Sequence, residues 1–441
     1  MQDPADLYPD HLKTVIERYE RAISDAGHDG ILIAAGEPPG VFLDDQHYPF
    51  RSNPHFVSWL PEDRLPSSYL HFVPGSKPRL YYFQPVDYWH KPPAPPSGYW
   101  TAHFDIEPIQ SLQDAANLLG DLRGTAWIGE DTAAATSLGM TAINPPDVLA
   151  SVHFDRAGKT DYEIACLANA NRIGARGHLE ARAAFMEGES EFDIQVRYLR
   201  AIGARESETP YSSIIALNEN CAVLHYQHYE ITPPPRHLSF LIDAGASYAG
   251  YGSDITRTWA AEAGPFADLV ARMDEEQQAL IGDIEPGLNY ADLHERMHYR
   301  LAAVLRDANL VAADPADMVE TNLTFSFLPH GLGHLLGIQT HDVGGFQQDR
   351  SGASRPAPEQ YPALRLTRDI EPGQVFTIEP GLYFIPMLLE ELRQHPLAAQ
   401  VNFELIESLL PYGGIRIEDN VLVTEDGTVN LTRNAFAELS S

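Results

Sequence analysis

Four carboxylates set within apolar segments constrain the fold of this chain more than any other feature of its sequence. They are Asp243, Asp254, Glu379 and Glu418, and each lies in or at the end of a stretch rich in apolar and β-branched residues. Burying an ionised carboxylate in such surroundings is costly unless a cation compensates its charge. Simpler explanations exist, since aspartates often cap turns beside glycines and Glu418 can pair with Arg416 at the surface.

Three histidines, His330, His334 and His341, stand among glycines and a short apolar run over residues 327–341. A lone histidine in such a run is more often a packed core residue than a ligand. His334 becomes a candidate ligand because the four carboxylates accompany it in the same chain. Two aspartates, two glutamates and one histidine form a hard, mostly oxygen donor set whose four negative charges two divalent ions would balance.

The order Asp, Asp, His, Glu, Glu, with the short sequence motif that flanks each residue, resembles the pita-bread metallopeptidase family. Within it the chain is most similar to the bacterial Xaa-Pro dipeptidases, or prolidases, including the branch also called organophosphorus acid anhydrolases. The resemblance covers nearly the whole chain. It implies an α/β N-terminal domain followed by an α+β pita-bread catalytic domain, of the creatinase and aminopeptidase kind, with an internal pseudo-two-fold.

The resemblance also implies how the ligands are shared. Asp254 and Glu418 would bridge two ions, His334 and Glu379 would complete the ligands of one, and Asp243 those of the other. The oxygen-rich set favours Mn²⁺, with Co²⁺, Zn²⁺ or Fe²⁺ as alternatives. A metal-bridged hydroxide would attack the carbonyl before proline, a protonated histidine would help to stabilise the oxyanion, and Glu379 would shuttle a proton to the leaving nitrogen.

Further residues match positions that contact the substrate in the family. His225, His330 and His341 are expected at the substrate or the intermediate, although each can instead have a packing role. Arg365 matches the clamp on the terminal carboxylate of the dipeptide, a task that suits a guanidinium because it binds both oxygens.

Five other positions complete the expected site. Arg416 lies two residues before Glu418, so on a strand it would share its face and orient that ligand or touch the substrate. The remaining candidates are Tyr211 and Tyr290, Asp45 for the substrate ammonium, and Trp89 as a wall of the pocket. In related enzymes the first domain of a partner subunit closes the chamber. The resemblance therefore implies a homodimer in which the loop over residues 42–56 reaches the neighbouring site.

Composition excludes several classes of function. The 441 residues include 62 acidic and 30 basic side chains, and this net charge of −32 argues against binding to nucleic acid or to anionic membranes. Only Cys166 and Cys221 occur, which predicts no disulfide framework and fits a reducing compartment. The sequence shows no signal-peptide pattern and no apolar run long enough to span a membrane, so a soluble cytoplasmic protein is expected.

Hydrophobic periodicity and turn chemistry place a boundary near residues 150–160. They predict an α/β domain over 1–155 and a second domain over 156–441. The resemblance implies that the first domain serves dimerisation and closure of the site and that the second is catalytic. Thr160 is the expected N-cap of a long helix, with Glu163 completing a capping box. Asp243 and Asp254 are expected to face one another on neighbouring strands of a hairpin.

The expected helices are 11–26, 111–119, 161–186, 190–202, 265–282 and 290–308. The expected strands are 30–35, 68–73, 79–83, 125–129, 213–217, 238–243, 256–261 and two more that carry Glu379 and Glu418.

Three other functions remain open. An aminopeptidase P would use the same ligands but remove the first residue of longer Xaa-Pro peptides. A phosphotriester or fluoridate hydrolase would pass through a similar oxyanion at phosphorus, and this chemistry is expected as a side activity. A metal-free binding protein on the same fold is disfavoured because all five ligands are present.

Overall fold

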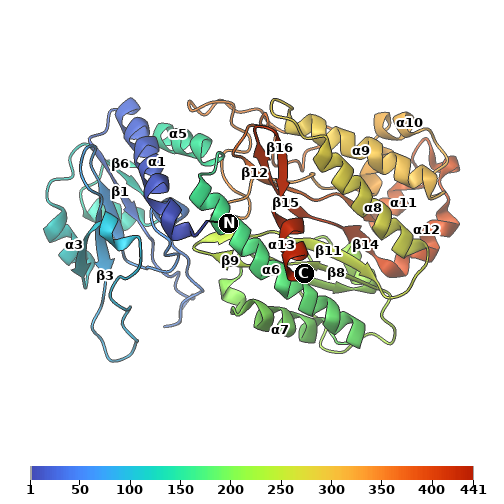
Figure 1. Cartoon of the computed structure of the whole chain (residues 1–441), viewed down its shortest axis with the longest axis horizontal. Coiled ribbons are helices and arrows are strands. Elements are labelled where there is room, and N and C mark those ends of the chain that lie inside the picture. The colour runs from blue at the N-terminus through green and yellow to red at the C-terminus, as the bar shows by residue number, and fades with distance from the viewer. Residues whose placement is uncertain (1, 441) are drawn as a thin grey trace. The chain divides into compact units, whose positions relative to one another are not determined.

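The computed structural model describes residues 2–440, which form two compact units (Figure 1). The first unit contains the chain as far as Arg156 together with Thr160–Cys166 and Asp349–Ala353. The second contains Ala157–Lys159, Leu167–Gln348 and the chain from Ser354 onward. The main division therefore falls beside the expected boundary at 155/156, but two later segments also pack with the first unit.

One six-stranded mixed sheet organises the first unit, in the order β4–β3–β2–β1–β5–β6. Strand β1 runs parallel to β5 and antiparallel to β2. All five residues of β1 are buried, which explains its unbroken apolar sequence. The strands are β1 (Gly30–Ala34), β2 (Tyr69–Phe72), β3 (Arg79–Phe83), β4 (Asp105–Ile109), β5 (Thr125–Ile128) and β6 (Ala142–Ile143).

Helix α1 buries the apolar face that its sequence predicts, including Leu12, Val15 and Ile23. It begins at Pro4 rather than near residue 11, because Asp3 caps it and proline suits the first helical position. The helices of this unit are α1 (Pro4–Asp25), α2 (Pro54–Val57), α3 (Leu112–Leu119), α4 (Thr132–Ser137) and α5 (Pro146–Arg156).

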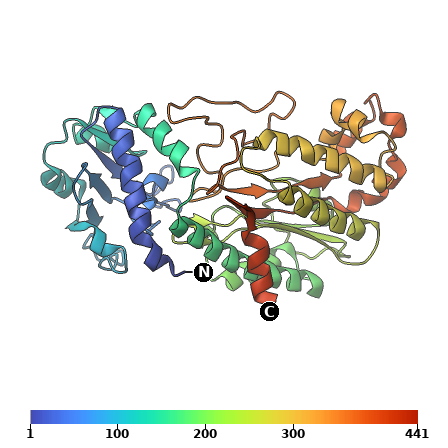
Figure 2. The same ribbon diagram turned by 45° about the horizontal axis from the view of Figure 1, so that its top comes forward.

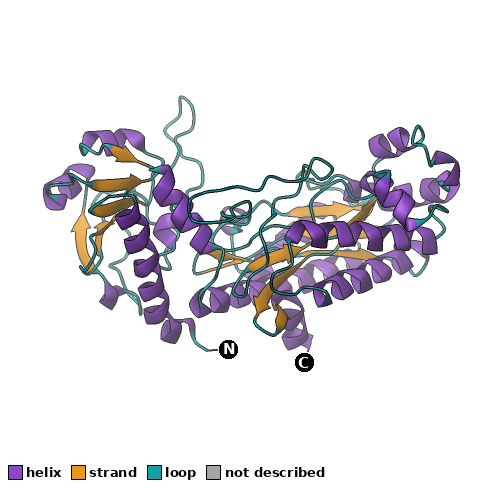
Figure 3. Cartoon of the chain, turned by 90° about the horizontal axis from the view of Figure 1, so that it is seen from above, coloured by secondary structure: helices purple, strands orange, loops and turns teal. Residues whose placement is uncertain are grey.

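The second unit contains two three-stranded sheets, β11–β8–β7 and β12–β15–β16, and the short pairs β9–β10 and β13–β14. In Figure 3 its long helices lie on one side of the strands and loops cover the other side. The strands are β7 (Ile214–Leu217), β8 (Ser239–Asp243), β9 (Ser247–Tyr248), β10 (Tyr251–Gly252), β11 (Thr256–Ala260), β12 (Val375–Ile378), β13 (Gly381–Tyr383), β14 (Gly414–Arg416), β15 (Asp419–Thr424) and β16 (Gly427–Asn430).

Helix α6 begins in the first unit and continues into the second, and a local signal explains its start. The predicted capping box is present, since Thr160 N–H donates to Glu163 and Glu163 N–H donates to the Thr160 hydroxyl. In Figures 1 and 2 the strands lie between the green α6 and α7 and the gold α8 and α9. The helices are α6 (Asp161–Glu187), α7 (Glu191–Ile202), α8 (Pro265–Gly282), α9 (Tyr290–Asp307), α10 (Pro315–Glu320), α11 (Pro386–Leu392), α12 (Phe403–Leu409) and α13 (Leu431–Ser440).

Strand β11 connects the two halves of the second unit. It pairs with β8 along its length, and Thr256 also forms a bridge with Glu418. Further along, the Thr258 hydroxyl donates to the Arg416 carbonyl and accepts from the Arg416 N–H. The apolar core around α8, α9 and β12 also includes Ile415 of β14 and Val421 of β15, so it packs against the strands of this junction.

Three details of the expected strands were wrong. Asp254 lies two residues before β11, because Asn420 binds both the N–H and the carbonyl of Asp254 and holds it outside the ladder. Glu379 and Glu418 lie in the breaks between β12 and β13 and between β14 and β15. Strands β4, β6, β9, β10 and β16 and helices α2, α4, α5 and α10 to α13 were not anticipated. Over residues 2–440, no helix is long and apolar enough to cross a membrane.

Candidate metal centre

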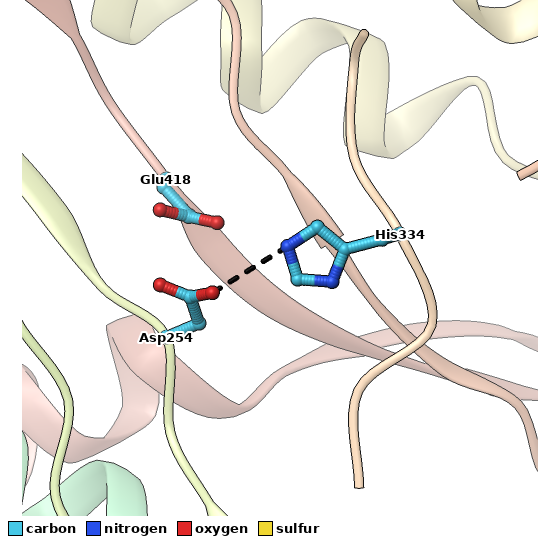
Figure 4. A group of neighbouring side chains, drawn as sticks. All are labelled: Asp254, His334 and Glu418. Carbon is cyan, nitrogen blue, oxygen red and sulfur yellow. Dashed lines mark ion pairs between the residues drawn. The ribbon is translucent and has the colours of Figure 1, made fainter. Parts of the chain in front are cut away.

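Three of the predicted ligands meet directly in the structure. One ligand atom from each of Asp254, His334 and Glu418 lies within 4.8 Å of the others, and all three residues are buried (Figure 4). His334 Nε2 is 3.4 Å from Asp254 Oδ2. The three side chains come from distant parts of the sequence, so the fold itself assembles this donor set.

Glu379 and Asp243 extend the cluster. The Glu379 carboxylate lies 3.7 Å from His334 Nε2 and 3.8 Å from His330 Nδ1. Asp243, at the end of β8, stands opposite Thr256 in the β8–β11 ladder. The Thr256 hydroxyl donates to Glu418 Oε2 at 2.8 Å. All five predicted ligands therefore lie around the junction of β11 with the second sheet.

The Asp243 carboxylate is held from two sides. Tyr211 donates its hydroxyl proton to Oδ1 at 2.8 Å, and Arg416 Nη2 donates to Oδ2 at 2.9 Å. Arg416 is buried, and its Nε also lies 3.3 Å from the Thr256 hydroxyl. Arg416 therefore binds Asp243 and meets Glu418 through the shared Thr256 hydroxyl, and the expectation that it orients Glu418 or touches the substrate stays a prediction. Tyr211 likewise contacts a predicted ligand.

Backbone and hydroxyl contacts fix His334. Its N–H donates to the Thr377 hydroxyl at 3.1 Å, and its Nδ1 donates to the Leu335 carbonyl at 3.0 Å, which leaves Nε2 facing the carboxylates. A Cβ atom at Gly333 would overlap the Thr377 carbonyl and the Tyr290 hydroxyl. Glycine at this position therefore lets the loop lie directly against β12.

The pKa shifts of the clustered carboxylates indicate that few positive charges compensate them. Burial, and then repulsion by Asp254, raise the pKa of Glu418 well above its ordinary value. Burial raises the pKa of Glu379 to about 7. At Asp254 the effect of burial is outweighed by His334, which lowers the pKa of that carboxyl, and Asp254 raises the pKa of His334 against the effect of burial. Oxygen-rich donors under mutual repulsion fit hard divalent cations.

His330 belongs to a second chain of contacts. Arg416 Nη1 donates to the Tyr383 hydroxyl at 2.8 Å, and that hydroxyl lies 2.9 Å from His330 Nε2. His330 Nδ1 donates to the Gly331 carbonyl, so Nε2 accepts the Tyr383 proton. Burial lowers the pKa of His330 to about 3, which predicts a neutral imidazole near pH 7.

His341, Arg365 and His225 are all exposed. The His341 ring meets His334 edge-on, with ring centroids 4.3 Å apart. Desolvation, and then the charges of His334 and Arg365, lower the pKa of His341 to about 4, although the ring reaches the surface. The charge of the exposed His225 also acts on both His330 and His341.

Tyr290 supports the site from within the core, and Asp45 and Trp89 belong to the first unit. Tyr290 is fully buried and its hydroxyl donates to the Thr377 carbonyl, so it supports the loop that carries His334 instead of facing the substrate. Asp45 and Trp89 are exposed in loops of the first unit. Nothing in the second unit requires either of them, and both stay predictions.

The sequence interpretation missed four side chains that hold the predicted site residues. They are Thr256, Thr377, Tyr383 and Asn420. Thr256, Thr377 and Asn420 each lie two residues from a predicted ligand, and that proximity was their only available signal. Tyr383 follows Glu379 by four residues across a strand break, where no periodic pattern relates the two.

Comparisons with known proteins agree with this geometry. A family model described as the N-terminal domain of Xaa-Pro dipeptidase matches residues 6–154, and a model of metallopeptidase family M24 matches residues 165–425. An Xaa-Pro dipeptidase of Pseudoalteromonas haloplanktis is 48% identical over 440 residues, covering 99% of this chain and 100% of that protein. An Xaa-Pro dipeptidase of Shewanella oneidensis is 46% identical, covering 98% and 99%.

Solved structures of lower identity share the fold. Aminopeptidase P from Escherichia coli superposes with a TM-score of 0.73 at 22% identity, over 99% of this chain and 96% of that one. Proline aminopeptidase P II from Yersinia pestis gives a TM-score of 0.71 at 22% identity, over 97% and 98%. The expected pita-bread fold with a preceding N-terminal domain is thereby confirmed.

Proposed function

The chain belongs to metallopeptidase family M24, as one of its Xaa-Pro dipeptidases, and on that premise we propose that it cleaves the bond before proline in Xaa-Pro dipeptides at a two-metal centre. The observation that carries the proposal is the buried Asp254–His334–Glu418 cluster, with Asp243 and Glu379 beside it. These five residues would hold two divalent ions, Mn²⁺ first and Co²⁺, Zn²⁺ or Fe²⁺ as alternatives. When bound, the ions would polarise the scissile carbonyl and lower the pKa of a water molecule.

The chain's own groups position and move protons. Glu379 would take the proton of the attacking water on a carboxylate oxygen and deliver it to the proline nitrogen. Its position between His330 and His334 supports this role. Arg416 and Tyr383 would keep Asp243 and His330 in place through their hydrogen bonds. The Xaa-Pro bond is a tertiary amide without an N–H, so a site built on metals and carboxylates loses nothing by that absence.

The two ends of the substrate would define its length. Arg365 would bind the terminal carboxylate, supported by its exposed position and by the effect of its charge on His341. In a homodimer, Asp45 of the partner subunit would bind the substrate ammonium. The solvent-exposed Phe42, Leu43 and Trp89 in the loops of the first unit support an association of this kind.

The test is a peptide-length series on the metal-loaded protein. We expect turnover of Ala-Pro and other Xaa-Pro dipeptides, little turnover of Xaa-Pro tripeptides, and about two metal ions per chain by elemental analysis. Faster cleavage of tripeptides would make the protein an aminopeptidase P instead. The side activity on phosphotriesters and fluoridates stays a prediction, to be measured on the same preparation.

Two further proposals concern the setting of the enzyme. Both cysteines are free and buried, which supports a reducing compartment such as the cytoplasm. The net charge of −32 supports the absence of a nucleic-acid partner. Cell fractionation and a nucleic-acid retention assay would check these two proposals.

A further inference from the structure

Glu191 has an unusual environment for a glutamate in the first turn of a helix. It is the first residue of α7 and is only 1% exposed. Glutamates at this position normally remain in water, where they interact with the helix dipole at little cost. A carboxylate this deeply buried needs several hydrogen bonds to replace its hydration.

The carboxylate accepts four hydrogen bonds in the described chain, and all four come from one segment, residues 217–230. The Leu217 N–H and the Asn220 amide donate to Oε1 at 2.8 and 2.9 Å. The Tyr226 hydroxyl and the Glu230 N–H donate to Oε2 at 2.7 and 2.8 Å. Glu191 therefore binds both ends and the middle of this segment at once.

The hydrogen bonds to Glu191 help to fix this segment, because the segment has little regular structure of its own. After Leu217, the last residue of β7, it contains the short 3₁₀ helix Asn218–Ala222 and no other helix or strand as far as Glu230. Its 3₁₀ helix packs tightly against the start of β14, where a Cβ atom at Gly413 would lie 2.7 Å from the Ala222 nitrogen. Strand β14 carries Arg416, which binds Asp243.

His225 lies within the segment, directly before Tyr226, and its side chain is exposed. The segment that carries His225 packs against the start of β14, the strand of Arg416, and the charge of His225 also acts on both His330 and His341. Tyr226 is buried with its hydroxyl on Glu191. The two neighbours thus have opposite roles, with Tyr226 anchored inward and His225 presented outward.

We propose that Glu191 is a positioning residue for the Xaa-Pro dipeptidase reaction, whose carboxylate fixes residues 217–230 so that His225 is held at the substrate. This inference rests on the proposed function and adds a residue that touches neither substrate nor metal. Glu191 acts on the reaction only through the segment it binds.

The test combines Glu191→Gln with His225→Ala. Glutamine keeps the shape but replaces one acceptor oxygen by a donor, so two of the four bonds are lost. We expect Glu191→Gln to lower kcat/KM for Ala-Pro by about tenfold or more, since each bond to a charged group contributes more than a neutral one. Metal content should match the wild type. The double variant should be no slower than His225→Ala alone, because both changes disable the same group.

Two other variants separate this role from general stability. Glu189→Gln, two residues away, loses a bond to Arg197 and leaves residues 217–230 untouched, so its kcat/KM should stay at the wild-type value. Tyr226→Phe removes a single donor from the segment and should give a smaller loss than Glu191→Gln. It also replaces Glu191→Gln in the double-variant comparison if that protein does not fold.

Hydrogen exchange gives a second measurement that does not depend on activity. Glu191→Gln should accelerate amide exchange in peptides covering residues 217–230, and Glu189→Gln should not. Unchanged exchange, unchanged kcat/KM, or effects of Glu191→Gln and His225→Ala that multiply would each overturn the inference. A wild-type protein that cleaves no Xaa-Pro dipeptide would instead overturn the proposed function, and the exchange result would still decide whether Glu191 fixes the segment.

Discussion

Arg416 shows how a single side chain can join separate parts of a site. Its guanidinium donates to Asp243 and to Tyr383, and the Tyr383 hydroxyl continues to His330. A lysine would supply one charge but not the planar fork that makes these separate contacts. A predicted ligand and a predicted substrate contact are therefore held by the same buried cation.

The ligands themselves give the most direct prediction at this scale. Asp254→Ala and His334→Ala should each lower activity by more than ~100-fold and reduce the metal content, because each removes a donor from a preformed cluster. Elemental analysis and circular dichroism on the same samples would measure metal and fold. Full activity in a variant that holds no metal would contradict the two-metal proposal.

Arg365 should affect substrate binding without affecting the metals. Arg365→Ala removes a charged partner of the substrate carboxylate, so KM for Ala-Pro should rise by about 10- to 100-fold. The amide Ala-Pro-NH₂ lacks that carboxylate and should lose much less. Steady-state kinetics on both substrates, with metal content as a control, would check this. Equal losses on the two substrates would show that Arg365 has a structural role.

At the scale of elements, the decisive feature is the crossing of β11 with β14 and β15. The Thr256 hydroxyl donates to Glu418 and lies beside Arg416 Nε. Thr258, two residues further on the same strand, binds only the backbone of Arg416 among the contacts in the described chain. The two threonines therefore form a matched pair, one on a ligand carboxylate and one on the strand.

Thr256→Val should weaken metal binding by about tenfold or more, because contacts behind a ligand tune metal affinity on that scale. Valine keeps the volume and the β-branch, so packing is little changed. Thr258→Val should shift the unfolding equilibrium by a similar factor, about tenfold, because it loses its bonds to the Arg416 backbone. Its metal affinity should stay near that of the wild type. Competition with a chelator would measure affinity and thermal unfolding would measure stability. Equal loss of affinity in both variants would contradict a specific role for Thr256.

His178 makes the packing of α6 on β8 sensitive to acid. Its Nε2 donates to the Ala244 carbonyl, and burial lowers its pKa to about 3. An unfolded histidine has a pKa of about 6.5, so below that pH the unfolded state binds a proton that the folded state does not. The contribution is absent above about pH 6.5 and destabilises the fold increasingly as the pH falls towards 3, by about 2 kcal/mol at pH 5.

His178→Gln tests this dependence, because glutamine can donate the same bond but does not titrate. The difference in unfolding free energy between pH 7 and pH 5 should be smaller in the variant by about 2 kcal/mol. All other titrating groups are common to both proteins and cancel in the comparison. Parallel pH profiles for the two proteins would show that His178 is not responsible.

The elements also show how far a sequence can predict this structure. The bounds predicted for α8 agree with Pro265–Gly282, because a proline start and a regular apolar face are local signals. The ligands could be identified from sequence motifs that resemble those of the family. The side chains that hydrogen-bond to the ligands could not be identified in this way. The bond from Arg416 to Asp243 spans 173 residues, and that from Asn420 to Asp254 spans 166. Such long-range contacts depend on how the two sheets cross. The hydrophobic periodicity of the individual strands therefore cannot predict them.

At the scale of the whole molecule, the loops of the first unit remain to be explained. Phe42 and Leu43 are 86% and 90% exposed, and Tyr88 and Trp89 are 87% and 76% exposed. Single exposed apolar residues need no explanation, but two loops that each present neighbouring ones indicate a surface that is covered in the assembled protein. Two-fold contact between identical chains is the commonest way to cover such a surface.

We therefore predict a homodimer in which Asp45 of the partner subunit completes each active site. Asp45→Ala should raise KM for Xaa-Pro dipeptides without removing metal, because it lacks the group expected to bind the ammonium. His334→Ala should be inactive because it lacks a ligand. In a mixed dimer, the chain that carries Asp45→Ala has an intact metal centre, and its partner still supplies an intact Asp45. One of the two chambers is then complete.

Mixing the two variants at low substrate concentration tests this arrangement. After random exchange of equal amounts, half of the dimers would be mixed and about a quarter of all chambers would be intact. Activity should rise towards that fraction of the wild-type value as subunits exchange, and size-exclusion chromatography with light scattering should show dimers throughout. Exchange should be followed independently with differently tagged chains. If exchange is demonstrated and activity does not recover, Asp45 acts within its own chain or away from the site, because a shared chamber would necessarily be restored.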